Sequence, residues 1–238
     1  MNTDWGDYFD RLKPDSPIYR EQSAAYVEAL ASAVPLHRDL RVLDFGCGFG
    51  FVAKMLAPLV KEVWFWDTSP NMRAFAQRNT AGAPNARLFR LAGTLQEQPE
   101  RVGDIGPVFD LILVNSVAQY MSPDELWAWL LRWRGMLAVE GKLVLSDLIP
   151  PRRSSLPDIV DLLGFAIRHG FALRAAADAL GGVLSYSQTS RSVPLLHVGR
   201  DDLQRHAADA GLELEVVPRN LTHFRKRWTA VLRPHSRT

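Results

Sequence analysis

Short apolar runs alternate with amphipathic segments through the middle of the chain. Between residues 40 and 149 these runs are almost continuously hydrophobic, as is typical of strands whose two faces are both covered by helices. We expect strands at 41–45, 63–66, 87–91, 109–115 and 142–147. The repeated order of strand and helix predicts an α/β fold with a doubly wound, mostly parallel sheet.

Helical spacing of apolar residues fills the intervals between these runs. The expected helices are 23–34, 70–79, 123–137 and 200–210, and two further strands are expected at 212–217 and 227–232. Two of the helices begin with a serine followed by proline, at Ser69 and Ser122, which is an N-cap followed by the residue best suited to the first helical position. Gly211 stands where a C-terminal cap is expected.

Residues 151–199 interrupt the alternation. Two prolines, Pro150 and Pro151, end the preceding unit, and an Ala-rich helical stretch from 156 to 180 runs up to two glycines. We expect this segment to be a helical lid inserted between the fifth strand and its helix. Residues 1–21 are aromatic and irregular and are expected to form an N-terminal cover, so the chain 1–238 is interpreted as one domain with two additions.

Composition and charge exclude several classes of protein. The chain is 47% hydrophobic and 23% charged, with a net charge of only +2. Apart from a basic C-terminal stretch its charges are balanced, which does not favour a nucleic-acid partner. Cys47 is the only cysteine, so an intramolecular disulfide and a multi-thiolate metal site are excluded. We see no secretory signal and no run of about 18 uncharged apolar residues, and we therefore expect a cytoplasmic protein without membrane spans or bound metal.

The strongest chemical signal is a glycine-rich turn after the first strand. Gly46, Gly48 and Gly50 follow it, but Phe51 stands where the dinucleotide-binding pattern would place its third glycine, which argues against a nicotinamide enzyme. Asp44, inside the strand, would repel a pyrophosphate and would attract the ammonium group of an amino acid. The turn therefore suits a zwitterionic ligand at a helix N-terminus.

A second carboxylate stands at the end of the second strand. Asp67 follows Asp44 by 23 residues, and an acid in this position can accept hydrogen bonds from ribose hydroxyls. An amino-acid site and a ribose site on neighbouring strands predict one ligand with both parts, namely S-adenosylmethionine.

These motifs resemble those of the class I S-adenosylmethionine-dependent methyltransferases. The similarity covers the segments 42–50, 67–72, 109–116 and 140–147. It implies a Rossmann-like seven-stranded sheet with an antiparallel last strand. It also implies that Asp44, Gly46 and Gly48 meet the methionyl part of the cofactor and that Asp67 holds the ribose.

The resemblance assigns further residues to the cofactor site. Thr68 and Met72 are expected to flank the adenosine, and Cys47 to fill space beside it. Family members often carry an acid after the third strand for the adenine; here that region offers Thr94 and Leu95 instead.

The segment after the fourth strand carries a hint about the acceptor. Asn115, Ser116 and Tyr120 belong to a stretch that resembles the corresponding motif of N-methyltransferase domains in nonribosomal peptide synthetases. This similarity implies contacts with the cofactor and amine-bearing substrates. Near the N-terminus, Tyr19 and Arg20 are expected either to cover the cofactor and pair with its carboxylate or to pack the N-terminal arm.

Methyl transfer from a sulfonium needs alignment in a dry pocket and requires a base only when the nucleophile arrives protonated. His197, at the junction of the insertion and the next helix, is the first candidate for such a base, and Tyr186 and His169 are the next. A structural role remains open for each.

We therefore expect a methyltransferase that acts on nitrogen, oxygen or carbon of a small, apolar or aromatic biosynthetic molecule, as a monomer or homodimer. Two alternatives stay open. One is methylation of RNA or protein, for which the basic C-terminal stretch is the only support; the other is a protein that binds the cofactor without transferring methyl.

Overall fold

The computed structural model describes residues 17–90, 108–151, 156–170 and 194–235 of the chain. Three predicted site residues, Thr94, Leu95 and Tyr186, lie outside these ranges.

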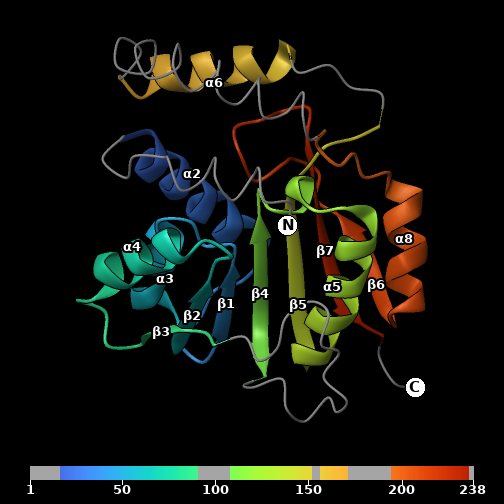
Figure 1. Cartoon of the computed structure of the whole chain (residues 1–238), viewed down its shortest axis with the longest axis horizontal. Coiled ribbons are helices and arrows are strands. Elements are labelled where there is room, and N and C mark those ends of the chain that lie inside the picture. The colour runs from blue at the N-terminus through green and yellow to red at the C-terminus, as the bar shows by residue number, and fades with distance from the viewer. Residues whose placement is uncertain (1–16, 91–107, 152–155, 171–193, 236–238) are drawn as a thin grey trace.

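Seven strands form one sheet in the order β3-β2-β1-β4-β5-β7-β6 (Figure 1). Every strand pair on the β3 side of β5 is parallel, whereas β7 pairs in antiparallel fashion with both β5 and β6. This is the doubly wound α/β sheet with an antiparallel last strand that the sequence predicts. The strands are β1 (Arg41–Phe45), β2 (Glu62–Trp66), β3 (Ala86–Leu88), β4 (Phe109–Asn115), β5 (Leu137–Leu148), β6 (Leu212–Val216) and β7 (Trp228–Pro234).

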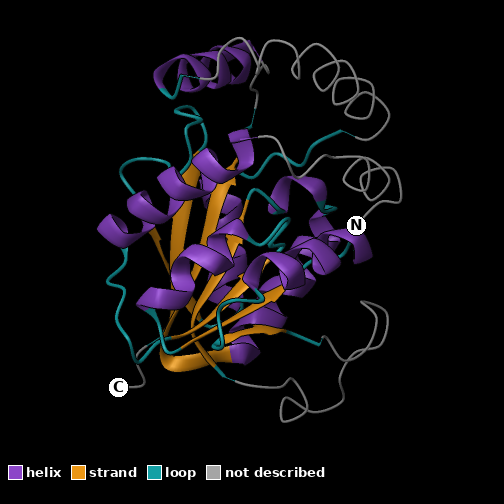
Figure 2. Ribbon diagram, turned by 90° about the vertical axis from the view of Figure 1, so that its left-hand side faces the viewer, coloured by secondary structure: helices purple, strands orange, loops and turns teal. Residues whose placement is uncertain are grey.

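Helices cover both faces of the sheet (Figure 2). Along β1 the side chains alternate, so that Val42 packs in one core and Leu43 in the other. The first core lies under α2 (Pro17–Ala33), α3 (Phe51–Leu56) and α4 (Pro70–Thr80), and the second lies under α5 (Pro123–Met136) and α8 (Arg200–Asp209). Two single turns, η1 (Ala57–Leu59) and η3 (Ala118–Tyr120), complete the described layers.

Aromatic rings fill the core beneath α5. The ring of Phe45 lies 4.5 Å from that of Trp129 and 5.2 Å from that of Trp133, in edge-on arrangements, and all three side chains are buried. Ser122 caps this helix in a complete capping box with Glu125, as its Ser-Pro start predicts. Trp129 and Trp133 of α5 are therefore core residues.

Several element boundaries differ from the sequence expectation. The first helix begins at Pro17, so residues 17–21 are helical and the expectation of an irregular segment there is wrong. In this first turn Tyr19 packs its ring 5.1 Å from that of Phe49, a contact that local sequence does not reveal. β3 ends at Leu88 and not at residue 91, as suits an edge strand that pairs on one side only.

The remaining helix, α6 (Leu156–Arg168), lies across the carboxyl edge of the parallel strands (Figure 1). It ends well before residue 180, and Gly170 follows with a φ of +76°. Its acids face the loop that joins β6 to β7, called here the β6–β7 loop (residues 217–227): the backbone N–H of Arg225 donates to Asp161 at 2.9 Å. Among the described helices, none combines the length and the apolarity needed to cross a membrane.

Candidate functional site

The glycine turn folds over the end of β2. The backbone N–H groups of Gly46 and Cys47 both donate to the carbonyl oxygen of Trp66, at 2.7 and 3.0 Å. Gly46, Gly48 and Gly50 all have positive φ, a region that side-chain-bearing residues resist. The turn therefore needs glycine for its backbone shape.

Close approach adds to this requirement at two of the glycines. A Cβ on Gly46 would lie 2.3 Å from a methyl group of Val117, and one on Gly50 would lie 2.8 Å from the backbone Cα of Ala76. Around Gly48, by contrast, no described atom comes within 4 Å of such a Cβ. This glycine faces open space, which is where a ligand of the turn would lie.

We expect Gly50→Ala and Gly48→Ala to behave differently. At Gly50 the left-handed backbone and the collision with α4 should together cost about 2–4 kcal/mol of unfolding free energy. At Gly48 the backbone cost of about 1–2 kcal/mol stands alone, but the added methyl group enters the ligand space. Thermal unfolding and S-adenosylhomocysteine calorimetry would check this: Gly50→Ala should show the larger loss of stability, and Gly48→Ala a loss of affinity beyond its loss of stability.

Asp44 is a buried carboxylate with an unused hydrogen-bonding oxygen. Its Oδ2 atom is buried and has no partner among the described residues. Burial, and then the charge of Asp67, raise the pKa of Asp44 to about 7, although the backbone N–H of Ala53 opposes the rise. A cation at this oxygen would satisfy it and favour its ionised form, so the site fits an ammonium group.

Asp67 lies beside the turn, at the end of β2. Its Oδ2 accepts from the backbone N–H of Gly48, and its Oδ1 accepts from that of Ser69, both at 2.9 Å. Burial raises its pKa, while these two bonds and the nearby guanidinium of Arg73 act in the opposite direction. A carboxylate has more acceptor sites than these two bonds use, so Asp67 keeps capacity for hydroxyl donors.

The neighbouring predicted residues surround this pair of carboxylates. Ser69 caps α4 by accepting from the backbone N–H of Met72, which places the buried Met72 in the first helical turn. Thr68 is exposed at the same strand end. The thiol of Cys47 is buried, and burial raises its pKa well above its usual value, consistent with an inert, space-filling role.

The ends of β4 and β5 carry unusual backbone. Ser116 and Asp147 are the two residues other than glycine, within the described ranges, that have positive φ, at +57° and +70°. The Ser116 hydroxyl donates to Asp147 Oδ2 at 2.9 Å, which links the two strand ends. Strained backbone of this kind gathers at functional sites. Next to it, Asn115 Oδ1 is buried and has no described partner.

Asp147 is the centre of a buried polar cluster. Besides Ser116, its carboxylate accepts from Thr222 Oγ1 at 2.7 Å, from Asn220 Nδ2 at 3.2 Å and from Arg227 at 2.7 Å. All three donors belong to the β6–β7 loop. The cluster therefore fixes this loop against the carboxyl edge of the sheet.

Arg227 extends the cluster to α6. Its guanidinium, with a side chain only 4% exposed, pairs with Asp147 at 2.7 Å and with Asp158 of α6 at 2.9 Å. Two more arginines of the basic C-terminal stretch form ion pairs at the surface, Arg225 with Asp161 and Arg233 with Glu215. The feature that supported an RNA partner is therefore partly neutralised.

The cover residues and the candidate base take different positions. Tyr19 packs its ring against Phe49 in the glycine turn, a contact that suits either a cover or packing of the N-terminal arm, whereas Arg20 is exposed. His197 is also exposed; its backbone forms a parallel bridge with Ile149, just beyond β5. Tyr120, in η3, is half-buried and lies near the Arg227 charge.

Sequence reasoning missed the β6–β7 loop. Asn220, Thr222, His223 and Arg227 come together there at the carboxyl edge, although they stand far along the chain from the glycine turn. The signal in the sequence that could have indicated this loop is the run of polar residues between the two last apolar strands.

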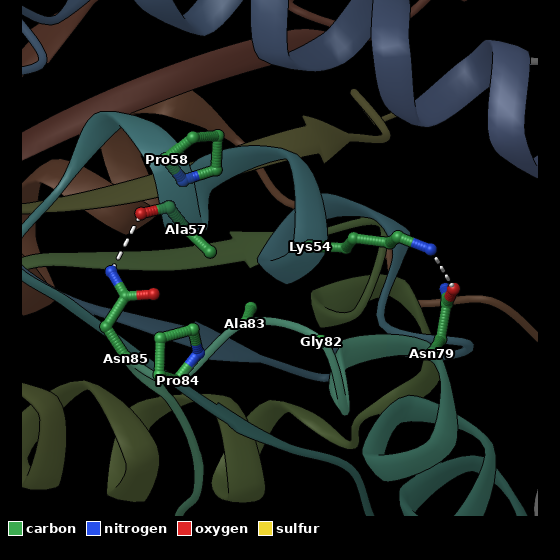
Figure 3. A pocket seen from close by; sticks show the side chains of 8 residues that line it. All are labelled: Lys54, Ala57, Pro58, Asn79, Gly82, Ala83, Pro84 and Asn85. Atoms are coloured by element: carbon green, nitrogen blue, oxygen red, sulfur yellow. Dashed lines mark hydrogen bonds between the residues drawn. The ribbon is translucent and has the colours of Figure 1, made fainter.

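A surface pocket of about 390 Å³ lies elsewhere, between the C-terminal ends of α3 and α4 (Figure 3). Its polar groups bond to one another or to backbone: Lys54 Nζ donates to Asn79 Oδ1 at 3.1 Å, and Asn85 Nδ2 donates to the Ala57 carbonyl at 2.7 Å. Helix C-termini here point to the amino edge of the sheet, away from Asp44. Within the described ranges there is no group of three or more His, Cys, Asp or Glu placed to hold a metal ion.

Comparison with known families and structures agrees with this geometry. Residues 43–143 match the model of a methyltransferase domain, a span that contains Asp44, the glycine turn and Asp67. No curated protein sequence matches the chain.

Three solved structures illustrate the likeness of fold. DhpI, solved in complex with SAH, is 16% identical with a TM-score of 0.60, over 99% of this chain and 97% of that one. Magnesium protoporphyrin IX methyltransferase (ChlM) from Synechocystis PCC 6803, with bound SAH, is 16% identical with a TM-score of 0.56, over 97% and 91%. N-methyltransferase NodS from Bradyrhizobium japonicum WM9 is 17% identical with a TM-score of 0.55, over 94% and 90%.

At such identities the solved structures establish the fold alone, and the family match covers the segment that carries the predicted motifs. Together with the sheet order and the glycine turn, they confirm the resemblance found in the sequence: this chain is a class I S-adenosylmethionine-dependent methyltransferase.

Proposed function

We propose that this enzyme transfers the methyl group of S-adenosylmethionine to a nitrogen, oxygen or carbon atom of a small, apolar or aromatic molecule. One observation carries the cofactor assignment. Asp44 Oδ2 is buried without a partner among the described residues, beside a turn whose central glycine faces open space. An amino-acid ammonium is the cation that fits there.

The residues divide the work of binding. Asp44 would hold the ammonium and the turn the rest of the methionyl part, while Asp67 would accept from the ribose hydroxyls. Thr68 and Met72 would flank the adenosine, and Tyr19 would cover it. When bound, the cofactor supplies an activated methyl group on sulfur. Thr94, Leu95 and Arg20 stay predicted contacts.

The acceptor would enter at the ends of β4 and β5, beneath α6. Asn115 and Ser116 stand at that edge. The buried Oδ1 of Asn115 has no partner in the described part of the chain, and the Ser116 hydroxyl is bonded to Asp147. What these residues supply is orientation and exclusion of water, which suffice for an in-line displacement. His197 and Tyr186 remain candidate bases. A small molecule is favoured over RNA because the arginines of the C-terminal stretch are mostly paired.

The cofactor assignment is tested by calorimetry with S-adenosylmethionine and S-adenosylhomocysteine. We expect Asp67→Ala to weaken both by at least tenfold, because hydrogen bonds to a charged group contribute about 1.5–3 kcal/mol. Asp67→Asn keeps the shape and should lose part of the same affinity. Asp39→Ala, which removes a carboxylate 95% exposed, should change nothing.

Methyl transfer itself is tested with labelled cofactor and a panel of phenols, amines and heteroaromatic compounds. Labelled product that appears in step with S-adenosylhomocysteine supports the proposal. Equal affinity of wild type and both Asp67 variants would refute the cofactor site, and labelling of RNA or protein alone would refute the acceptor class.

A further inference from the structure

The inner side of α6 faces the β6–β7 loop and uses both apolar and charged contacts. Phe165 is buried and packs its ring on that of His223, with 4.8 Å between the centroids. The only two acids of the helix, Asp158 and Asp161, bond to arginines of the same loop. The charges that a surface helix ordinarily presents to water are therefore used within the molecule.

The outer face of α6 is apolar. It consists of Val160, Leu163 and Ile167, which are 68%, 45% and 66% exposed and whose spacing of three and four residues puts them on one side of the helix. Gly164 belongs to the same side, and a Cβ added there would have no described atom within 4 Å, so the middle of the face is uncovered. Both views show α6 above the carboxyl edge, beyond the other described helices (Figure 1, Figure 2). A contiguous apolar face in such a position marks an interaction surface.

The exposed charges that border this face are basic. Arg168 follows directly after the outer face, and Arg225 and Lys226 are exposed in the loop that contacts the helix. At about 100° per residue, Arg168 and Asp161 share one flank of α6, and Asp161 is already paired with Arg225. This border favours an anionic partner, whereas a second copy of the same face would bring its own cations against these.

We propose that the outer face of α6 is a docking surface for an anionic lipid bilayer, with Arg168 and Lys226 against the headgroups and the apolar side chains between them. An apolar helix face bordered by cations is the pattern with which a helix lies in a membrane interface. Because α6 crosses the carboxyl edge of the sheet, docking would bring that edge next to the lipid, where apolar molecules dissolve. This inference goes beyond the proposed function and does not depend on it.

The test is sedimentation of the full-length protein with vesicles of phosphatidylcholine alone and of phosphatidylcholine mixed with phosphatidylserine. We expect the protein to sediment with the mixed vesicles at low salt and to be released at high salt. Val160→Ser with Ile167→Ser should weaken this binding by at least about tenfold, because two apolar side chains no longer enter the lipid. Its melting temperature should equal that of wild type, because both side chains are already exposed in the free protein.

Leu131→Ser with Val139→Ser is the matched control. These side chains are 61% and 83% exposed and lie on α5 and near the start of β5, so this variant should bind the mixed vesicles as wild type does. Arg168→Gln with Lys226→Gln tests the charges: binding to the mixed vesicles should weaken by about tenfold or more, since each cation near an anionic surface contributes about 1 kcal/mol.

Equal sedimentation of wild type with both kinds of vesicle, or with neither, would refute this inference. So would equal binding by the α6 variant and its matched control, or a lower melting temperature of the α6 variant, which would show that the outer face is packed in the free protein. Analytical ultracentrifugation tests the other occupant: a wild-type dimer that dissociates in Val160→Ser with Ile167→Ser would assign the face to a second copy. These measurements contain no S-adenosylmethionine, so their failure leaves the proposed function intact.

Discussion

Replacing Arg227 with methionine is expected to lower the free energy of unfolding by about 3–5 kcal/mol, because the change leaves two carboxylates, one of them fully buried, without their cation. The side chain of Asp147 is 1% exposed and that of Asp158 is 17% exposed. Water therefore screens the charge of Asp147 hardly at all. For a chain of this size the melting temperature should fall on the order of 10 °C, as measured by calorimetry.

Arg225→Met is the matched control. Its side chain is 71% exposed and pairs at 3.7 Å with Asp161 of α6, the helix that also carries Asp158. Its removal should therefore cost no more than about 1 kcal/mol. A second variant, Arg227→Met with Asp158→Asn, should recover part of the loss. Equal melting temperatures for Arg227→Met and Arg225→Met would show that the buried ion pairs do not hold α6 and the β6–β7 loop in place.

Affinity for S-adenosylhomocysteine is expected to fall steeply with pH below 7, because the ligand ammonium requires ionised Asp44. Desolvation and the charge of Asp67 raise the pKa of Asp44 to about 7 in the free protein, so at pH 5 nearly every molecule must first lose a proton. Linkage then predicts a rise in Kd of about 50-fold between pH 7 and pH 5. Calorimetry in buffers of different ionisation enthalpy should show that binding at pH 6 releases a proton.

Asp44→Asn separates this effect from a general loss of structure. The carboxyl group has its pKa raised on folding, so it destabilises the free protein increasingly as the pH rises from about 4 to 7. The amide carries no such cost, and the free variant should melt no lower than wild type at pH 8. Its affinity should be weak and nearly independent of pH. A pH-dependent Kd that persists in Asp44→Asn would assign the proton to another group.

Local patterns determine most of the sheet in this protein. β1 and β4 have the bounds that their apolar runs predict, and the Ser-Pro starts of α4 and α5 mark caps that form as expected. These features depend on residues within a few positions of one another. The same holds for the glycine turn, whose order after a buried strand predicts both the positive φ values and the class of ligand.

Boundaries set by distant contacts are different. The first turn of α2 carries Tyr19, whose ring packs on Phe49, and β5 begins at Leu137, which pairs with Phe109 across a register shift. Neither partner is near in sequence, so neither boundary follows from a window of neighbouring residues.

The sequence by itself thus determined the α/β architecture and the glycine turn, and it predicted a cofactor site at Asp44 and Asp67, since each of these features lies in a short, ordered motif. Only the tertiary structure decided that Arg227 is a buried link to α6 and that His223 faces the edge of the sheet. The physical reason is that a charge or an imidazole acquires its role from its burial and its partners. Those partners lie dozens of residues away in the chain, so the spacing of residues along it carries no record of them.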